Sequence, residues 1–272
     1  MNFVFASLMA LQVLQVTVIP DEDPRALIRK FEPLGEHLEK ATGMEVRYVP
    51  VTNYAAAVDA LVTGRVDLAW FGGLTHVQAR LRGPGVRAII MRAEDAEFHS
   101  KFIAGSDSGI EVIGDLKGRT FTFGSVSSTS GHLMPRYFLE ENGLNPERDF
   151  DRFAFSNAHD VTALWVESGR VDAGALNESV WETLVREGRV DTEKVRVIWT
   201  TPPYPDYNWT VRAGLDPDLV RRIQRAFLEL DEANPEHRAI LELQRTQGYV
   251  EADNDMFAPI EEAARRAGLI QN

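Results

Sequence analysis

The chain has 272 residues, a net charge of −12 at pH 7 and no cysteine. The acidic balance argues against a nucleic-acid partner, because phosphate backbones are bound by clustered Lys and Arg side chains. The lack of cysteine excludes disulfides, thiolate metal sites, cysteine catalysis and a lipid attached to an N-terminal Cys.

The N-terminal stretch MNFVFASLMALQVLQ is apolar and resembles the hydrophobic part of a signal peptide. It lacks the basic start and the clear small-residue cleavage site of such a peptide. We interpret residues 1–13 as a leader or residual signal segment; the alternative is a first strand with a ragged leader. No other stretch approaches the roughly 20 apolar residues that a membrane span needs. We therefore expect a soluble periplasmic protein.

A long internal repeat organises the rest of the chain. The segments YAAAVDALVTGRVDLAW (54–70) and HDVTALWVESGRVDAGA (159–175) share GRVD and the same layout. Each reads as an amphipathic helix, a glycine turn and a buried strand. Gly64 and Gly169 stand where the end of a helix needs a left-handed residue.

The repeat extends outwards from these two segments. Each is preceded by a strand, a helix and a strand, and each is followed by a further helix and strand. This alternation predicts an α/β fold with mainly parallel sheets in two similar lobes. We place the first segment of lobe 1 at residues 14–104, lobe 2 at 105–206, and a return to lobe 1 with C-terminal helices at 207–272.

The return begins near TTPPYPDYNWTVRAG (200–214), where three prolines discourage regular structure. Three helices are expected after it. Asp216-Pro217 and Asn234-Pro235 are helix starts of the usual kind, and FAPIEEAARRAG (257–268) forms the third.

The segment FGSVSSTSGHLMP (123–135) joins a predicted strand to a predicted helix, which we expect to begin at residue 130 or 131. Ligands of open α/β sheets bind where such junctions lie, and a helix N-terminus attracts anions. Short hydroxyl side chains add neutral donors, so the segment suits an anion; the alternative is a Ser/Thr helix cap without a ligand. The spacings of a nucleophile elbow and of a P-loop are both missing. His132 is expected on the surface of the helix.

Equivalent positions of the repeat give two further candidates. Tyr54 and His159 both begin the helix that precedes GRVD, and both are expected to point toward the cleft between the lobes. Phe71 and Gly72, in WFGG, offer a wall and a backbone donor for that cleft. The histidines have no zincin-like spacing, so we expect no metal site and no cofactor.

Taken together, YAAAVDALVTGRVDLAWFGG, SSTSGHLMP, AHDVTALWVESGRVDAG and WTTPPYPDYNW resemble the substrate-binding proteins of phosphate, phosphite and phosphonate ABC transporters. The resemblance covers about residues 14 to 250 and implies a type II periplasmic-binding-protein fold that closes like a hinge on a tetrahedral oxyanion. It implies that Ser128, Thr129 and Ser130 hold the oxyanion, and that His159 and Tyr54 donate from the two sides of the cleft.

Two departures from the family pattern bear on the first-lobe wall and on the ligand. His76 stands where many members have an aromatic residue, and Gly73 replaces a proline. Aminoalkyl-phosphonate binders place acidic residues where Ser179 and Tyr207 align here. Some similar members are labelled putative selenate-binding.

A carboxylate that faces the ligand would select phosphate, phosphite or phosphonate, which can carry a proton near neutral pH, over selenate and sulfate. Asp206 and Asp160 are the candidates for this carboxylate, and Asp160 also suits the first turn of a helix.

We therefore expect a non-enzymatic receptor, a monomer, that binds a tetrahedral oxyanion and delivers it to an ABC permease of the inner membrane. Three alternatives stay open. The ligand could be selenate or sulfate, the lobes could be the anion-sensing module of a signalling system, or the fold could have become an enzyme with His159 as its base.

Overall fold

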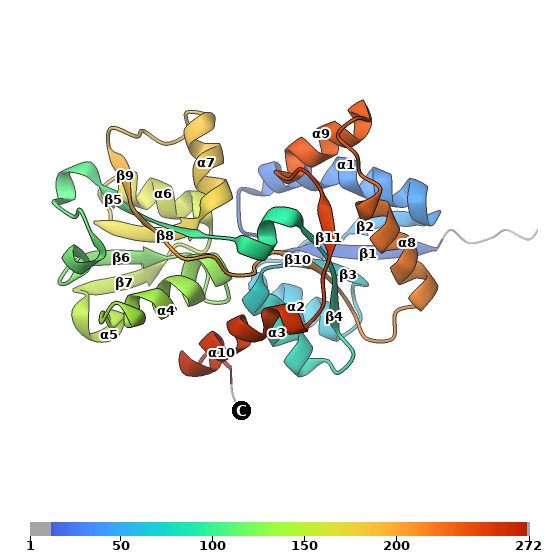
Figure 1. Ribbon diagram of the computed structural model, residues 1–272, viewed down its shortest axis with the longest axis horizontal. Helices are drawn as coiled ribbons and strands as arrows, with labels where there is room; N and C mark the ends of the chain where they lie inside the picture. Colours follow the sequence, from blue (N-terminus) through green and yellow to red (C-terminus); the bar gives the residue numbers. More distant parts are fainter. Residues whose placement is uncertain (1–11, 271–272) are drawn as a thin grey trace, which may run out of the picture.

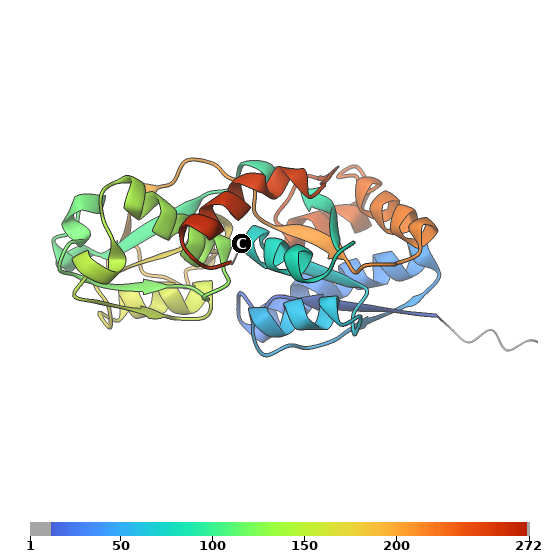
Figure 2. The ribbon, with the colours of Figure 1, turned by 90° about the horizontal axis from the view of Figure 1, so that it is seen from below.

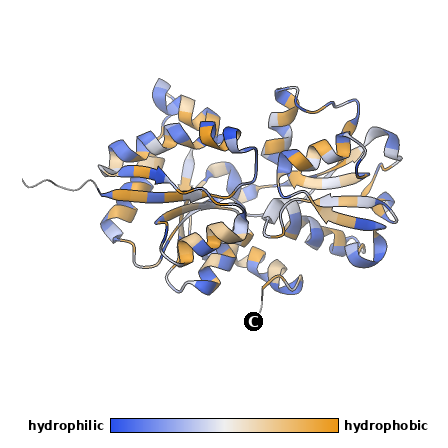
Figure 3. Cartoon of the chain, turned by 180° about the vertical axis from the view of Figure 1, so that it is seen from behind, coloured by the Kyte–Doolittle hydropathy of each residue, from blue (hydrophilic) through white to orange (hydrophobic). Residues whose placement is uncertain are grey.

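The computed structural model describes residues 12–270 and folds them into two lobes, each built on one mixed sheet (Figure 1). The expected leader, residues 1–13, lies outside the described residues except for its last two. Figure 3 shows hydrophobic residues on the strands and on the helix faces turned toward them, and hydrophilic residues on the outer helix faces. The two lobes therefore have the layered α/β architecture that the sequence predicts.

The sheet of lobe 1 has the strand order β11-β4-β10-β3-β1-β2. Its strands are β1 (Val13–Val18), β2 (Glu45–Tyr48), β3 (Leu68–Phe71), β4 (Arg87–Arg92), β10 (Asn208–Val211) and β11 (Tyr249–Glu251). The sheet of lobe 2 has the order β7-β6-β8-β5-β9. Its strands are β5 (Ser100–Gly105), β6 (Thr120–Phe123), β7 (Arg152–Phe155), β8 (Ala173–Asn177) and β9 (Val195–Thr200).

Parallel pairing, which the sequence predicts to dominate, is confined to β2-β1-β3 and β7-β6-β8. Strands β10 and β5 pair antiparallel with both of their neighbours. The reason is connectivity. Both strands follow directly from a crossing between the lobes, so they enter their sheets from the opposite end instead of through a helical crossover.

Helices cover both sheets, as Figure 2 shows from below. Lobe 1 carries α1 (Pro24–Thr42), α2 (Tyr54–Val62), α3 (Gly73–Arg82), α8 (Pro217–Leu228), α9 (Pro235–Gln244) and α10 (Ala258–Arg266). Lobe 2 carries α4 (Met134–Glu141), α5 (Pro146–Asp149), α6 (His159–Glu167) and α7 (Glu178–Arg186). The three expected C-terminal helices are present, and the side chains of Asp216 and Asn234 cap α8 and α9 as predicted.

The GRVD repeat has a structural role that is the same in both lobes. Asp67 accepts a hydrogen bond from the backbone N of Gln15 at 3.0 Å, and Asp172 accepts one from the backbone N of Thr120 at 2.8 Å; both pairs are 52 residues apart. Each aspartate thus joins two neighbouring parallel strands, β3 to β1 in lobe 1 and β8 to β6 in lobe 2. Gly64 and Gly169 have φ values of 72° and 68°, as the predicted helix ends require.

The chain crosses between the lobes twice, before β5 and before β10. An isolated antiparallel bridge between Phe98 and Tyr204 ties the two crossings together. Because β5 pairs only in the second sheet, we place the first crossing before residue 100, upstream of the boundary at 104 expected from the sequence. Helix α10 reaches lobe 2 beneath the crossings (Figure 1), where Arg266 pairs with Glu141 at 2.6 Å.

Candidate functional site

The segment Ser128–Gly131 forms a helix start whose first turn is unusually wide. A π-helix spans Thr129–Leu133 and leads into α4, one or two residues earlier than the sequence predicts. Ser128 is its N-cap and accepts a hydrogen bond from the backbone N of Gly131 at 3.0 Å. A β-carbon on Gly131 would lie 2.9 Å from His159 Cε1, so only glycine fits beneath that ring. The segment therefore offers the free N–H groups and hydroxyls of a helix N-terminus at a tightly packed point.

A second helix start, that of α3 in lobe 1, faces the first. The backbone N of Leu74 donates to Thr129 Oγ1 at 3.0 Å, and the hydroxyl of Thr75 donates to the carbonyl of Ser127 at 3.2 Å. Gly72, just before α3, has room for no side chain, because a β-carbon there would lie 2.9 Å from Thr129 Oγ1. These bonds hold the lobes together across the site, so the structure has the lobes closed.

Tyr54 reaches the same place from lobe 1. It is the first residue of α2, which Asn53 caps, and its side chain is buried. Burial raises the pKa of the Tyr54 phenol well above its usual value, and Ser128 is its hydrogen-bond partner. Tyr54 of lobe 1 is therefore a neutral donor beside the helix start at Ser128 of lobe 2.

His159 approaches from lobe 2, as the repeat predicts. Its backbone N donates to the carbonyl of Asp21 in lobe 1 at 2.9 Å, and its Nδ1 accepts from the backbone N of Asn177 at 3.3 Å. Burial lowers the pKa of His159 to about 4, so the ring is neutral at pH 7. A neutral ring that accepts at Nδ1 carries its proton on Nε2. His159 thus presents one N–H to its surroundings, without a charge.

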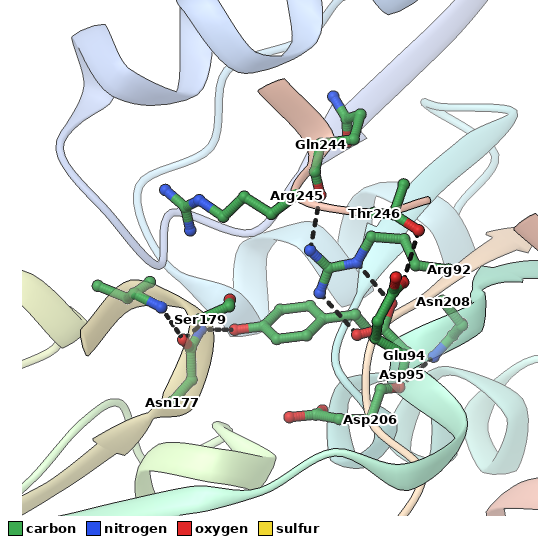
Figure 4. Close-up of polar contacts among 12 residues, drawn as sticks. Arg92, Glu94, Asp95, Asn177, Ser179, Asp206, Asn208, Gln244, Arg245 and Thr246 are labelled. Carbon is green, nitrogen blue, oxygen red and sulfur yellow. Dashed lines mark hydrogen bonds and ion pairs between the residues drawn. The ribbon is translucent and has the colours of Figure 1, made fainter. Parts of the chain in front are cut away.

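Asp206 lies on the second crossing between the lobes, near the Arg92–Asp95 ion pair (Figure 4). Its Oδ1 accepts from the backbone N of Gly73 at 3.0 Å, while Oδ2 is buried without a hydrogen bond among residues 12–270. Burial raises the pKa of Asp206 to about 7, although Gly73 and Thr129 oppose the shift. Asp206 can therefore share a proton near neutral pH.

Asp160, the other candidate carboxylate, lies outside this site. It stands in the first turn of α6, accepts from the backbone N of Val161, and faces Arg189 at 3.7 Å.

The remaining candidates lie in the interior of the lobes, Phe71 and His76 in lobe 1 and His132 in lobe 2. Phe71 ends β3 and is fully buried. His76 is turned into lobe 1, where its Nδ1 contacts Thr210 Oγ1 at 2.8 Å and its ring packs on Phe257. His132 is buried and not on the helix surface, because its ring fills a space beside Phe123.

Three residues not singled out as site candidates complete the cluster. The phenol of Tyr207 donates to Asp21 Oδ2 at 2.9 Å, accepts from Asn177 Nδ2 at 2.8 Å, and lies 3.4 Å from His159 Nε2. Its ring stacks on Trp70 with centroids 4.4 Å apart. Asp21 follows β1, Asn177 ends β8 and Tyr207 lies on the second crossing. Their places next to strand ends are the sequence signal that could have identified them as site residues.

The site also carries buried polar atoms whose bonding is incomplete. Asp21 Oδ1, Asp206 Oδ2 and Ser130 Oγ have no hydrogen bond of normal geometry among the described residues. An unsatisfied buried polar group costs about 1–3 kcal/mol. Donors (Tyr54, His159, the helix N-terminus) and acceptors (Asp21, Asp206) therefore converge on one small volume, which suits an anion that brings a proton.

No helix among the described residues is long and apolar enough to cross a membrane. Within residues 12–270 no group of three His, Asp or Glu side chains is arranged to hold a metal ion.

Comparison with known proteins agrees with this geometry. The sequence profile of a family described as "ABC transporter, phosphonate, periplasmic substrate-binding protein" matches residues 16–257. The probable ABC transporter phosphite binding protein PhnD1 of Prochlorococcus marinus is 36% identical over 271 residues, covering 96% of this chain and 91% of that protein. The phosphonates-binding periplasmic protein of Escherichia coli is 28% identical, covering 85% and 70%. The structure of PhnD1 in complex with methylphosphonate superposes with a TM-score of 0.91, covering 95% of this chain and 99% of that one.

Proposed function

The chain belongs to the periplasmic substrate-binding proteins of phosphonate ABC transporters, and we propose that it binds phosphite or a small phosphonate such as methylphosphonate between its lobes. The family consists of transport components that bind a solute, so the chain is a binding protein and not an enzyme. In the proposed function it acts in the periplasm as a monomer and passes the ligand to an ABC permease in the inner membrane. The relative PhnD1, which is named a probable phosphite binding protein and has been solved in complex with methylphosphonate, supports this choice of ligand.

One observation carries the proposal: the helix start at Ser128–Gly131 meets Tyr54, His159 and Asp206 from three other parts of the fold. We assign the oxyanion to Ser128, Thr129 and Ser130, which offer hydroxyl and backbone donors at the positive end of a helix. Tyr54 and His159 add one donor from each lobe. Such a site holds an anion through local neutral donors, because the net negative charge of the protein does not attract one.

Asp206 gives the site a preference among oxyanions. Its unpaired Oδ2 accepts from a P–OH group, or donates to an ionised oxygen when Asp206 is protonated; in both cases ligand and carboxyl share one proton. Sulfate and selenate bring no proton near neutral pH, so they bind only when Asp206 is itself protonated and otherwise face an ionised carboxylate. This argues for a phosphorus oxyanion over the sulfate-type alternative.

The same geometry argues against a long aminoalkyl tail. Ser179 Oγ lies 3.3 Å from Asn177 Oδ1, and the phenol of Tyr207 is engaged by its own partners. Neighbouring Glu178 is paired with Lys101 at 2.6 Å. An ammonium group would therefore lack a free carboxylate at these positions.

The test replaces the hydroxyls at the helix start. We expect the double variant Thr129→Ala/Ser130→Ala to lower methylphosphonate affinity by well over tenfold in titration calorimetry, because a hydrogen bond to a charged group is worth about 1.5–3 kcal/mol. Ser127→Ala is the matched control, since only its backbone carbonyl is used. Unchanged affinity in the double variant would refute this site. Thermal-shift screening of phosphate, phosphite, methylphosphonate, aminoethylphosphonate, sulfate and selenate identifies the preferred ligand.

A further inference from the structure

A basic pocket opens on the boundary between the lobes, outside the site described above. It has a volume of about 240 Å³ and is lined by residues of α1, of α7 with the turn after it, and of the end of α9. Figure 1 shows α7 of lobe 2 facing α1 and α9 of lobe 1 along the same edge of the molecule. Five of the ten lining residues are basic: Arg29, Lys30, Arg186, Arg189 and Arg245. The two acidic ones are Glu187 and Glu242.

The basic residues differ in how far their charge is already compensated. Lys30 and Arg245 share the buried Glu22, at 3.6 and 2.6 Å. Arg189 has Glu187 at 3.4 Å and Asp160 at 3.7 Å. Arg29 and Arg186 have no ion pair within residues 12–270; Arg186 donates only to the hydroxyl of Thr183. One uncompensated cation therefore stands on each side of the boundary.

The pocket is adjacent to the ligand site. Lys30 Nζ, in its wall, lies 4.2 Å from the centre of the Trp70 ring, and Trp70 stacks on Tyr207 in the site. Glu22, which binds Lys30 and Arg245, is next in sequence to Asp21. The buried Lys30 and Glu22 therefore separate the pocket from the Asp21–Tyr207 part of the site.

The other end of the same boundary has the opposite charge. A groove of about 840 Å³ shares Arg186, Glu242 and Arg245 with the basic pocket, but its walls carry Glu94, Glu97, Glu178 and Glu182. Glu182 and Arg186 are one turn apart on α7, so the sign of the field changes along that helix. An anion that approaches the boundary is repelled at the acidic end and attracted at the basic end.

We propose that the cations around the basic pocket form an outer capture site, which attracts the anionic ligand to the boundary between the lobes. The proposal rests on the proposed function, because it assumes an oxyanion as the ligand. A protein with a net charge of −12 repels anions at long range. A local cluster of cations at the mouth of a cleft reverses this field over a short distance and raises the association rate.

The experiment measures association and dissociation of methylphosphonate by stopped-flow tryptophan fluorescence, using Trp70 beside the site. The capture variant is Arg29→Gln/Arg186→Gln. The matched control is Arg65→Gln/Arg87→Gln, which makes the same change in net charge at two exposed arginines that have no ion pair among the described residues and do not line the pocket.

At 20 mM NaCl we expect the capture variant to bind methylphosphonate with an association rate about three- to tenfold lower than wild type and with an unchanged dissociation rate. At 0.5 M NaCl, where screening is strong, its association rate is expected to lie within about twofold of wild type. The control variant is expected to stay within about twofold at both salt concentrations. Glu182→Gln, one turn away from Arg186, is expected to accelerate association.

An equal loss in both arginine variants would overturn the proposal, since only net charge would then matter. Faster dissociation with unchanged association would also overturn it, because the arginines would then act as closure contacts. If the wild-type protein shows no fluorescence change and no calorimetric heat with any phosphorus oxyanion, the proposed function fails as well; normal wild-type binding with unaffected variants removes only the capture site.

Discussion

Replacement of Asp206 by asparagine tests the shared proton that we assign to the ligand site. Asparagine keeps the shape and the acceptor for the backbone N of Gly73, but it puts an amide NH₂ where Oδ2 is unpaired. Below pH 7 Asp206 is itself protonated and donates to an ionised ligand oxygen, as the amide would. We therefore expect Asp206→Asn to leave methylphosphonate affinity at pH 6 within about threefold of wild type.

The pH dependence gives the sharper result. Because the pKa of Asp206 is raised to about 7, the free protein loses this proton above pH 7, and the complex must then take one up to keep it. Wild-type affinity is therefore expected to fall as the pH rises above 7, by up to about tenfold per unit, since one pH unit is worth 1.36 kcal/mol. In the Asp206→Asn variant this slope is expected to flatten, and sulfate binding is expected to improve.

Titration calorimetry from pH 6 to 9 in buffers of different ionisation heat measures both affinity and proton uptake. Asp160→Asn is the control, because Asp160 pairs with Arg189 outside the site. A variant at position 206 that keeps the wild-type slope and proton uptake would refute the role assigned to Asp206, and would move the shared proton to another group such as Asp21.

Three further predictions concern the two sides of the site. Gly131→Ala is expected to lower affinity at least tenfold, because its β-carbon would lie 2.9 Å from His159 Cε1, whereas Gly114→Ala, which meets no atom within 4 Å, should bind normally in the same calorimetric titration. Tyr54→Phe removes the phenol that pairs with Ser128 and should weaken binding about tenfold with little loss of thermal stability; a large loss of stability would mean a structural role. Burial lowers the pKa of His159 to about 4, so between pH 6.5 and 4 the unfolded chain binds a proton at this residue and the folded chain does not. The melting temperature of the wild-type protein should therefore fall as the pH is lowered from 6.5 to 4, and that of His159→Gln should fall less.

The parts of the site that the sequence predicts are those with a local signal. The helix start at Ser128 follows from the order of a strand, hydroxyl residues and a glycine, and the pairing of Tyr54 with His159 follows from the repeat. Both features depend on short-range sequence patterns, so their prediction does not depend on whether the sheets are mixed or mainly parallel.

Residues whose placement depends on the tertiary fold could not be predicted in the same way. Asp21 and Tyr207 are 186 residues apart and meet only because β1 and the second crossing end at the same edge of the lobe 1 sheet. A single histidine carries no period or motif, so the sequence places His76 in the wall of the cleft and His132 on the helix surface, although both are buried within their lobes. The antiparallel β5 and β10 likewise follow from the direction of the crossings, which the alternation of strands and helices does not encode.

The proposed oxyanion site is tested most directly by calorimetric titration of the wild-type protein at pH 7 with methylphosphonate and, in parallel, with sulfate. Both are tetrahedral anions of similar size, but only methylphosphonate can bring the proton that it shares with Asp206, whereas sulfate needs Asp206 to be protonated already. We predict binding of one methylphosphonate per chain and clearly weaker binding of sulfate. Equal binding of the two anions, or binding of sulfate alone, would contradict the assignment of the site to a phosphorus oxyanion.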